Sequence, residues 1–408
     1  MRVTGLVRRL GPLGASAIGL SSMIGAGVFY VWAPAAERAG SWLLVALLIA
    51  GTIALLNALV MAQLSLENPV SGGAYRFGQK YVSPRVGFLA GSLFLIGKTC
   101  SAGAIALVAA RYIAPDHAPA VAAGLVALFV ALNITGIRTT AAVSLVAVVL
   151  VVGVLVTTLV VSAPGPRAGM DWVDATGWGV LQAAGLMFFA FAGYARMATL
   201  GDEVKNPRRV LPAVIIGTLL AVLVLYGLIG WVLRNTLGVS ALASSTAPVA
   251  DLASPELAPY VIAAAALASL GSLAAILAGL SRTSMAMAQS GDLPAKLGFV
   301  WPTTSSPMVA EATMGAGAIV LVLVVDPLWL VGASSGAVLS YYAIAHWSAT
   351  KQPPTERVLP AWLPWLGLVG CALLVVALPW QSVLATALAI GGVLGVWSLR
   401  DRGRQKLG

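Results

Sequence analysis

The stretch Ile24-Gly25-Ala26-Gly27-Val28-Phe29 lies at the middle of the first long apolar segment of the chain, residues 12–36. Glycine costs about 1 kcal/mol in a helix interior, so two glycines on either side of one alanine weaken the helix here. One interpretation is close packing of helices through small residues. The other is an unwound segment whose freed backbone groups face a ligand. The motif alone is compatible with both.

The composition of the 408-residue chain is that of a polytopic membrane protein. Hydrophobic residues make up 59% of it and charged residues only 9%, against about 25% charged residues in soluble domains. Such a chain lacks the polar surface to cover itself in water. A soluble enzyme, a nucleic-acid-binding protein and a disordered scaffold are therefore excluded. Cys100 and Cys371 both lie in apolar stretches, so neither a disulfide framework nor a metal site is implied, and no cofactor is expected.

A membrane-spanning helix needs about 20 mostly apolar residues. On this basis the sequence predicts an all-α integral membrane protein with about twelve transmembrane helices. The gaps between them leave little room for a separate soluble catalytic unit. The expected spans are residues 12–36, 41–65, 86–112, 118–135, 140–162, 178–200, 209–233, 258–288, 308–325, 328–348, 360–379 and 381–399.

The basic residues predict the orientation of these spans. If the N-terminus is cytoplasmic, only Arg38, Arg111, Arg167 and Arg234 fall in outer segments, and eighteen other Lys and Arg residues fall in inner segments. Lys and Arg accumulate in cytoplasmic loops, so both termini are expected in the cytoplasm. The expected location is the plasma (inner) membrane. The net charge of +10 follows from this bias and does not indicate a nucleic-acid partner.

The sixth span contains a second glycine interruption, Phe188-Phe189-Ala190-Phe191-Ala192-Gly193-Tyr194-Ala195-Arg196. If spans 1–5 and 6–10 are two repeats, spans 1 and 6 occupy matching positions and the second repeat is inverted. The predicted division is residues 1–162, 163–350 and 351–408, the last holding spans 11–12 and a cytoplasmic tail. Interrupted helices at matching positions of inverted repeats are a pointer to a transporter binding site. Helix N-termini attract anions and exposed carbonyls accept from cations, a combination that fits an amino acid zwitterion.

Four stretches, in this order along the chain, resemble the amino acid–polyamine–organocation (APC) superfamily of permeases. The resemblance implies a five-plus-five inverted repeat with broken helices 1 and 6, two additional C-terminal helices, and amino acid transport across a membrane. It covers residues 11 to about 350. The stretches are Ile24-Gly25-Ala26-Gly27-Val28-Phe29, Pro69-Val70-Ser71-Gly72-Gly73-Ala74-Tyr75, Gly201-Asp202-Glu203-Val204-Lys205-Asn206-Pro207-Arg208-Arg209 with Leu211-Pro212, and Gln289-Ser290-Gly291-Asp292-Leu293-Pro294.

The resemblance also implies roles for individual residues. Backbone N–H groups around Gly25, Ala26 and Gly27 would hold the substrate carboxylate. Carbonyl groups near Ser22, Phe189 and Ala192 would accept from the α-ammonium, and Phe189 would close over the substrate unless it is an ordinary core or lipid-facing residue. Tyr194 is either a second lid or a packing residue. The candidate substrate-binding residues are Ser22, Ile24, Gly25, Ala26, Gly27, Lys98, Phe189, Ala192, Gly193 and Tyr194.

Lys98 lies well inside the third span, in Leu95-Ile96-Gly97-Lys98-Thr99-Cys100. A lysine at this depth costs about 2.5–3.5 kcal/mol on insertion scales, so it is expected to face the interior or a water-filled cavity. Snorkelling to an interface is unattractive, because roughly 18 Å of helix lies on either side at about 1.5 Å per residue. Lys98 is therefore a candidate for substrate binding and for gating or coupling. Burial disfavours its charged form, so a neutral amine is the alternative.

Arg196 follows the glycine interruption of the sixth span. Members of the superfamily more often have an acidic residue one position earlier, where this chain has Ala195, so that gating role does not carry over. Arg196 is a candidate gating or coupling residue that pairs with a carbonyl or with Glu203, or else a structural charge near the cytoplasmic helix end.

The sequence leaves the coupling ion open. None of the fourteen acidic residues lies clearly at mid-membrane, where a proton relay usually needs a carboxylate or histidine. His346, near the end of the tenth span, is a candidate for protons. Ser269 and Ser272 offer oxygen atoms to sodium, although serines in spans more often bond to their own helix. Two further hypotheses are that Lys98 stands in for a bound cation and that exchange needs no coupling ion.

The leading hypothesis is a secondary transporter for amino acids that works by alternating access. The repulsion that Lys98 would exert favours neutral or acidic substrates, and the alternative is a cationic amino acid or polyamine exchanger. An enzyme embedded in the membrane would need clustered catalytic groups at mid-depth, which the sequence lacks. A channel would require rings of polar residues from repeated subunits, and the two-repeat layout argues against it.

Overall fold

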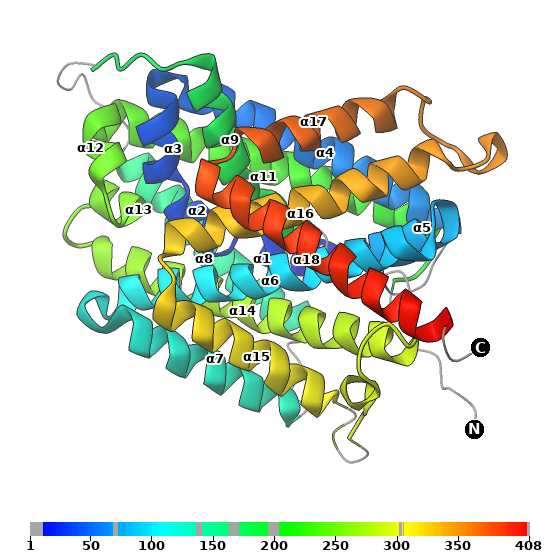
Figure 1. Cartoon of the computed structure of the whole chain (residues 1–408). Helices are drawn as coiled ribbons and strands as arrows, with labels where there is room; N and C mark the ends of the chain where they lie inside the picture. Colours follow the sequence, from blue (N-terminus) through cyan, green and yellow to red (C-terminus); the bar gives the residue numbers. More distant parts are fainter. Residues whose placement is uncertain are drawn as a thin grey trace.

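The computed structural model is a bundle of α-helices that run roughly parallel or antiparallel to one another (Figure 1). It describes residues 11–67, 72–135, 141–162, 171–194, 204–301, 304 and 306–405. Among these residues the only strand-type pairing is an isolated bridge between Trp301 and Ser306. The all-α prediction is therefore confirmed.

The elements of the first half run from α1 to the 3₁₀ turn η3. They are α1 (Pro12–Met23), α2 (Ala26–Tyr30), α3 (Trp32–Ala39), η1 (Gly40–Trp42), α4 (Leu43–Glu67), α5 (Ala74–Tyr81), α6 (Pro84–Ile113), η2 (Pro115–His117), α7 (Ala118–Ile134), α8 (Ala141–Val161), α9 (Gly177–Phe191) and η3 (Ala192–Tyr194).

The second half begins with the 31-residue helix α11. Its elements are α11 (Pro207–Leu237), α12 (Val239–Ser244), α13 (Pro248–Leu252), α14 (Ala258–Gln289), η5 (Ala295–Gly298), α15 (Met308–Val324), α16 (Pro327–Thr350), η6 (Pro354–Glu356), α17 (Leu363–Ala377) and α18 (Trp380–Gln405).

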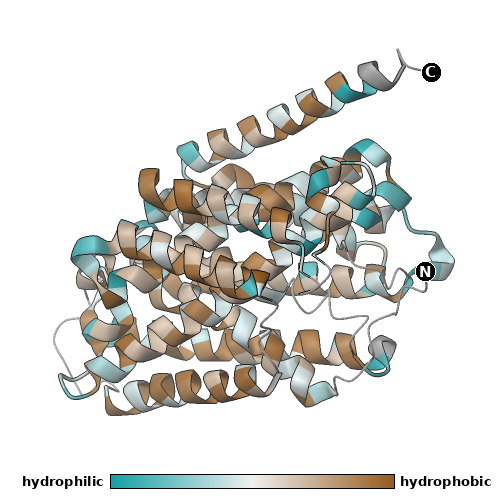
Figure 2. Cartoon of the chain, turned by 90° about the horizontal axis from the view of Figure 1, so that it is seen from below, coloured by the Kyte–Doolittle hydropathy of each residue, from teal (hydrophilic) through white to brown (hydrophobic). Residues whose placement is uncertain are grey.

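The helices have the length and polarity distribution of membrane spans. Within the described part of the chain, ten helical segments are long and apolar enough to cross a bilayer, and Met308–Val324 and Leu363–Ala377 are shorter apolar helices. Together they correspond to the twelve expected spans. Figure 2 shows hydrophobic residues along the sides of the helices and hydrophilic residues gathered toward their ends. The chain is an integral membrane protein, because only a bilayer gives such lateral surfaces a favourable environment.

The two ends of the bundle carry different short elements. At one end, on the right of Figure 1, lies α5; at the other lie α3, α12 and α13. We call them the α5 end and the α12 end. The turn into α5 requires glycine, because Gly72 and Gly73 have φ of 127° and 51°, a region that other residues rarely adopt.

Local signals explain where the central helices begin. Pro84 and Pro327 occupy the first positions of α6 and α16, where a missing N–H costs nothing. Ser83 and Asp326 precede them, and their side-chain oxygens accept from the N–H groups of Val86 and Leu328. Helices α6 and α16 pack on each other, and α6 also packs on α14. These three helices form the scaffold around which the broken helices lie.

The first span is broken where the sequence motif stands. Helix α1 ends at Met23, and α2 begins at Ala26. Ile24 and Gly25 between them have ψ of 75° and −150°, far from helical values. The unwound segment is therefore present in the structure.

The sixth span is also interrupted near its glycine. Helix α9 ends at Phe191 and passes into the tighter turn η3, which contains Gly193. Residues 195–203 lie outside the described residues, so Arg196 and the beginning of the Gly201–Arg209 motif have no structural account here.

Candidate functional site

The two helix interruptions pack directly on each other. A Cβ added to Gly27 would lie 2.5 Å from Cα and 2.8 Å from Cβ of Ala190 on α9. A Cβ added to Gly193 would run into the carbonyl group of Ser22, at the end of α1. Both glycines are thus required by backbone-to-backbone approach. The packing and unwinding interpretations of the sequence motif are therefore both realised.

The first broken span and α9 run antiparallel along this contact. Gly27 packs against Ala190. Further along the same contact, Gly179 near the start of α9 packs against the carbonyl of Arg38 near the end of α3. The contact continues beyond α3, where Ser41 N–H donates to the carbonyl of Val173 at 2.8 Å. This antiparallel pairing places the two interruptions at the same depth in the bundle.

A cavity opens beside the paired interruptions. Its empty volume is about 330 Å³, a figure that includes space open to the surroundings. It is lined by Ser22, Met23, Gly25, Ala26, Gly27, Lys98, Ser101, Ile105, Phe189, Ala190, Ala192, Gly193, Ser272 and Ile276.

The cavity brings together most of the residues that the sequence singles out. Ser22, Gly25, Ala26, Gly27, Lys98, Phe189, Ala192 and Gly193 all line it. Ile24 and Tyr194 are buried, with exposed fractions of 4% and 1%, but neither is among the lining residues. The ring of Tyr194 instead stacks on Tyr342, with ring centroids 5.1 Å apart. Arg196 lies outside the described residues.

The start of α2 presents backbone donors to this cavity. Gly25 N–H is already used, because it donates to the carbonyl of Met23 at 2.9 Å. No side chain caps α2, and the first N–H groups of a helix have no partner within it. Ala26 and Gly27 are therefore the donors that this helix start offers to an anion, with the helix dipole in their favour.

Two carbonyl groups at the other interruption already have donors. The carbonyl of Phe189 accepts from the N–H of Ala192. The carbonyl of Ala192 accepts from Lys98 Nζ at 3.1 Å. The side chain of Lys98 thus lies where the cationic group of a bound zwitterion was expected.

Lys98 is the only charged side chain among the described residues that line the cavity. Its exposed fraction is 6%, and it reaches the cavity from the middle of α6. It does not snorkel to a helix end. A buried ammonium with one carbonyl partner leaves donors available for a further acceptor, since the group carries three.

Several lining residues were not singled out by the sequence as substrate contacts. Ser101 lies one turn after Lys98 on α6, and Ser272 and Ile276 lie one turn apart on α14. Ser272 also fills the space beside Gly25, because a Cβ on Gly25 would collide with its Oγ. Helical spacing from Lys98 would have identified Ser101.

Tyr226 on α11 connects the two interruptions. Its hydroxyl donates to the carbonyl of Met23 at 2.8 Å and lies 3.3 Å from the carbonyl of Ala190. The side chain is fully buried and its ring packs against Phe191 and Trp32. A single tyrosine in an apolar helix has no pattern that predicts such a role.

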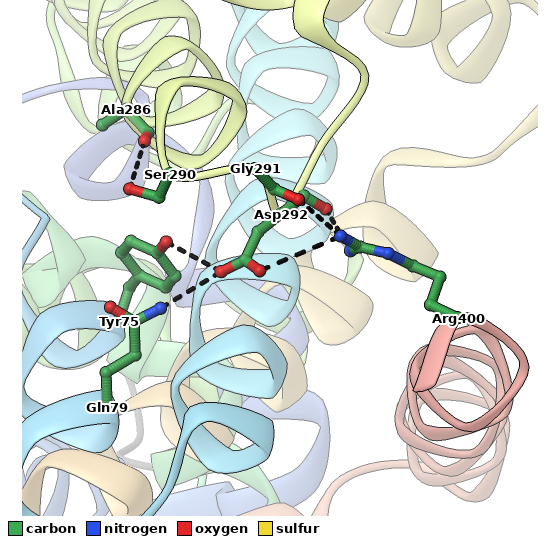
Figure 3. A network of polar contacts seen from close by, with 7 residues as sticks. All are labelled: Tyr75, Gln79, Ala286, Ser290, Gly291, Asp292 and Arg400. Carbon is green, nitrogen blue, oxygen red and sulfur yellow. Dashed lines mark hydrogen bonds and ion pairs between the residues drawn. The ribbon is translucent and has the colours of Figure 1, made fainter. Parts of the chain in front are cut away.

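A second polar network lies at the α5 end (Figure 3). Asp292, which follows α14, accepts from the hydroxyl of Tyr75 at 2.8 Å and from Nε2 of Gln79 at 3.1 Å. Arg400 on α18 donates to the carbonyls of Gly291 and Asp292 and lies 4.0 Å from the Asp292 carboxylate. Two of the four motif stretches, those ending in Tyr75 and containing Asp292, therefore meet in space.

Comparison with known proteins identifies the family. The family model described as amino acid permease matches residues 10–391. An uncharacterized transporter of Mycobacterium tuberculosis is 43% identical over 406 residues, which cover 97% of this chain and 92% of that protein.

More distant relatives have names that state a substrate class. The branched-chain amino acid permease BcaP of Bacillus subtilis is 26% identical and covers 98% of this chain and 95% of its own length. The vacuolar cationic amino acid transporter 2 of Arabidopsis thaliana is 30% identical and covers 85% of this chain and 60% of its own length. Helix breaks, cavity and family match agree: the chain belongs to the amino acid permease family of the APC superfamily and is a membrane transporter for amino acids, not an enzyme.

Proposed function

We propose that this protein is a secondary active transporter that carries amino acids by alternating access around the cavity at the two helix interruptions. The observation that carries the proposal is that the uncapped start of α2, at Ala26 and Gly27, and Ala192, whose carbonyl Lys98 binds, line the same cavity. A carboxylate at the first and an ammonium at the second match the two ends of an amino acid. The coupling of the two interruptions through Tyr226 supports a rearrangement that moves both.

The substrate ammonium and Lys98 compete for the same carbonyl. Lys98 Nζ holds the Ala192 carbonyl at 3.1 Å in this structure, so a bound amino acid takes its place there and Lys98 turns to another acceptor. The acceptors that a substrate brings are its carboxylate and, for an acidic amino acid, its side chain. We therefore propose that neutral or acidic amino acids are favoured.

The charge of Lys98 opposes a cationic substrate. Two like charges 4–6 Å apart repel by about 3–4 kcal/mol at an effective dielectric constant near 20, which corresponds to more than a hundredfold in affinity. The described lining holds no carboxylate to offset this repulsion. The 26% identity to a branched-chain permease agrees with this proposal, and the cationic transporters of Arabidopsis thaliana represent the alternative.

The proposed topology follows the distribution of basic residues. The α5 end carries Arg76, Lys80 and Arg400 and corresponds to the inner side of the positive-inside prediction. We propose that this end faces the cytoplasm and that the membrane is the plasma (inner) membrane. The network around Asp292 then closes the cytoplasmic side of the carrier.

The test is counterflow in proteoliposomes with labelled neutral, acidic and cationic amino acids. The parent protein should exchange neutral or acidic amino acids in a saturable manner and discriminate against lysine and arginine. Lys98→Ala should reduce that discrimination, or abolish exchange if the amine takes part in the cycle. Lys296→Ala, an exposed lysine outside the cavity, is the matched control. Strong arginine exchange that is unchanged in Lys98→Ala would contradict the substrate proposal.

A further inference from the structure

A second buried polar cluster lies next to the cavity but does not line it. Its members come from four elements that are far apart in the sequence: α4, η3, α16 and α17. Each side chain has an exposed fraction of 1% or less. We call it the histidine cluster, and it consists of Asn57, Tyr194, Tyr342, His346 and Cys371.

The hydrogen bonds of the cluster determine which nitrogen of His346 carries the proton. Nε2 of His346 lies 2.8 Å from Oδ1 of Asn57, and Sγ of Cys371 donates to the same oxygen at 3.1 Å. An amide oxygen accepts and has no hydrogen to give. With this amide orientation, the neutral imidazole carries its hydrogen on Nε2, and Nδ1 keeps a free lone pair. Nδ1 is buried and has no hydrogen-bond partner.

Other polar atoms of the cluster are also left without partners. Nδ2 of Asn57 and the hydroxyls of Tyr194 and Tyr342 are buried and make no hydrogen bond of normal geometry. The Tyr194 hydroxyl nevertheless lies within interaction range of Tyr342 and Asn57. Buried polar groups are nearly always paired in native proteins, so this many in one place mark a site with a task other than packing.

The cluster is mechanically connected to the substrate cavity. Tyr194 closes the turn η3, two residues after Ala192, whose carbonyl binds Lys98. Gly193 between them lines the cavity. The Tyr194 ring stacks on Tyr342, which lies one helical turn before His346 on α16 and so points the same way. The stacked rings of Tyr194 and Tyr342 thus link the broken sixth span to the part of α16 that carries His346.

We propose that His346 is the proton-binding group of this carrier, and that Asn57, Tyr194 and Tyr342 transmit its protonation state to η3. A hydronium ion on one side of the membrane transfers its proton to the Nδ1 lone pair and is left as water, and the Nδ1–H bond later breaks as the proton passes to water on the other side. The protonated ring donates at both nitrogens and draws an acceptor toward Nδ1. The hydroxyl oxygens of Tyr194 and Tyr342 are the acceptors that the cluster supplies.

The charges of the surrounding elements are engaged elsewhere or lie at the helix ends. Helices α4, α5, α6, α9, α17 and α18 pack on α16. Lys98 binds Ala192, Arg76 binds Gln79, Arg111 pairs with Asp326, and Arg400 pairs with Asp292. Glu67 ends α4, and Lys80, Arg85 and Asp401 lie toward the ends of α5, α6 and α18. Besides His346, the titratable members of the histidine cluster are Tyr194, Tyr342 and Cys371, with Tyr341 packed on Tyr342, and none of the ion pairs among the described residues involves His346.

The first experiment measures proton-driven accumulation in proteoliposomes, and it rests on the proposed transport function. A pH difference of one unit permits about tenfold accumulation when one proton moves per substrate. The parent should approach this limit and lose it with a protonophore. His346→Gln keeps a donor for Asn57 but cannot be protonated, so it should exchange substrate while its accumulation ratio falls to about one. His117→Gln, the same change at the only other histidine of the sequence, which is exposed, should behave as the parent.

The second experiment needs no substrate. The imidazole resonances of the histidine-labelled parent are followed by NMR between about pH 5 and 8, and because the sequence contains two histidines, His346→Gln and His117→Gln assign them. The resonance that is lost in His346→Gln should move from the neutral to the protonated position as the pH falls. His346→Asn replaces the glutamine variant if that variant does not fold.

The outcomes separate the two proposals. If amino acid exchange is unaffected by a proton gradient, or if accumulation persists in His346→Gln, His346 is not the proton-binding group of the carrier. The proposal of amino acid transport is not contradicted by either result. A pH-dependent shift of the His346 resonance without exchange of any amino acid contradicts the transport proposal and supports proton binding at His346. A His346 resonance that keeps its neutral position down to about pH 5 overturns proton binding at His346.

Discussion

Gly27→Ala is the most informative small perturbation of the paired helix interruptions. The added Cβ would lie 2.5, 2.8 and 3.3 Å from Cα, Cβ and N of Ala190. Two of these three atoms are backbone, so α9 has to move as a whole. Overpacking of this kind costs typically 1–3 kcal/mol.

The assay is counterflow in proteoliposomes at equal protein incorporation, together with the melting temperature of the purified protein. A loss of 1–3 kcal/mol at the site corresponds to a reduction in uptake of about 5- to 150-fold. Gly124→Ala on α7 is the matched control, because nothing lies within 4 Å of its added Cβ. This control should transport normally and melt at the same or a slightly higher temperature, since alanine is the better helix former.

If uptake by Gly27→Ala is within twofold of that by Gly124→Ala and the melting temperature is unchanged, the close approach of α2 to α9 is not required for the transport cycle. A lower melting temperature with unchanged uptake would assign Gly27 to packing alone.

Three further predictions concern other parts of the structure. Phe189→Ala should weaken the apparent affinity for substrate and Phe189→Trp should be tolerated better, because the side chain lines the cavity; equal kinetics of all three proteins would place it outside the site. Asp292→Asn should weaken the network at the α5 end and raise the rate at which a protease digests that end. An unchanged digestion rate would show that the contacts of Asp292 with Tyr75 and Arg400 do not hold the α5 end closed. Asp171 lies in the loop before α9, and hydrogen bonds from Ser240 and Val239 hold its pKa below the usual 3.8. Its stabilising effect is present above that value and is lost as the pH falls through the lowered pKa, so the difference in melting temperature between the parent and Asp171→Asn should shrink on acidification; a constant difference would argue against the effect.

The sequence predicts the fold well because long apolar runs in a bilayer have few alternatives. Every backbone polar group has to be satisfied within the segment, so each run becomes a helix. Glycine pairs such as Gly25 and Gly27 identify the break, because each glycine lowers the stability of a helix interior by about 1 kcal/mol. Two of them close together therefore indicate a segment that is not a regular helix. The depth of Lys98 in its helix likewise predicts that it faces the interior.

Contacts between distant segments are not accessible to this kind of reasoning. Tyr226 is one of many large residues in an apolar helix, and only the fold shows that its hydroxyl reaches Met23 and Ala190. The sequence leaves Tyr194 open between lid and packing residue, and the structure places its ring against Tyr342. His346 could be named as a proton candidate, but its partner Asn57 lies 289 positions away, and no local pattern connects them.

A substrate site at the helix interruptions can be tested by ligand-induced stabilisation of the purified protein, measured for the parent and for Gly27→Val. A neutral or acidic amino acid should raise the melting temperature of the parent, because a ligand at 100 times its Kd adds about 2.7 kcal/mol of stability. Gly27→Val fills the approach between α2 and Ala190 and should insert normally without responding to that ligand. The same stabilisation of both proteins would contradict a substrate site at the helix interruptions.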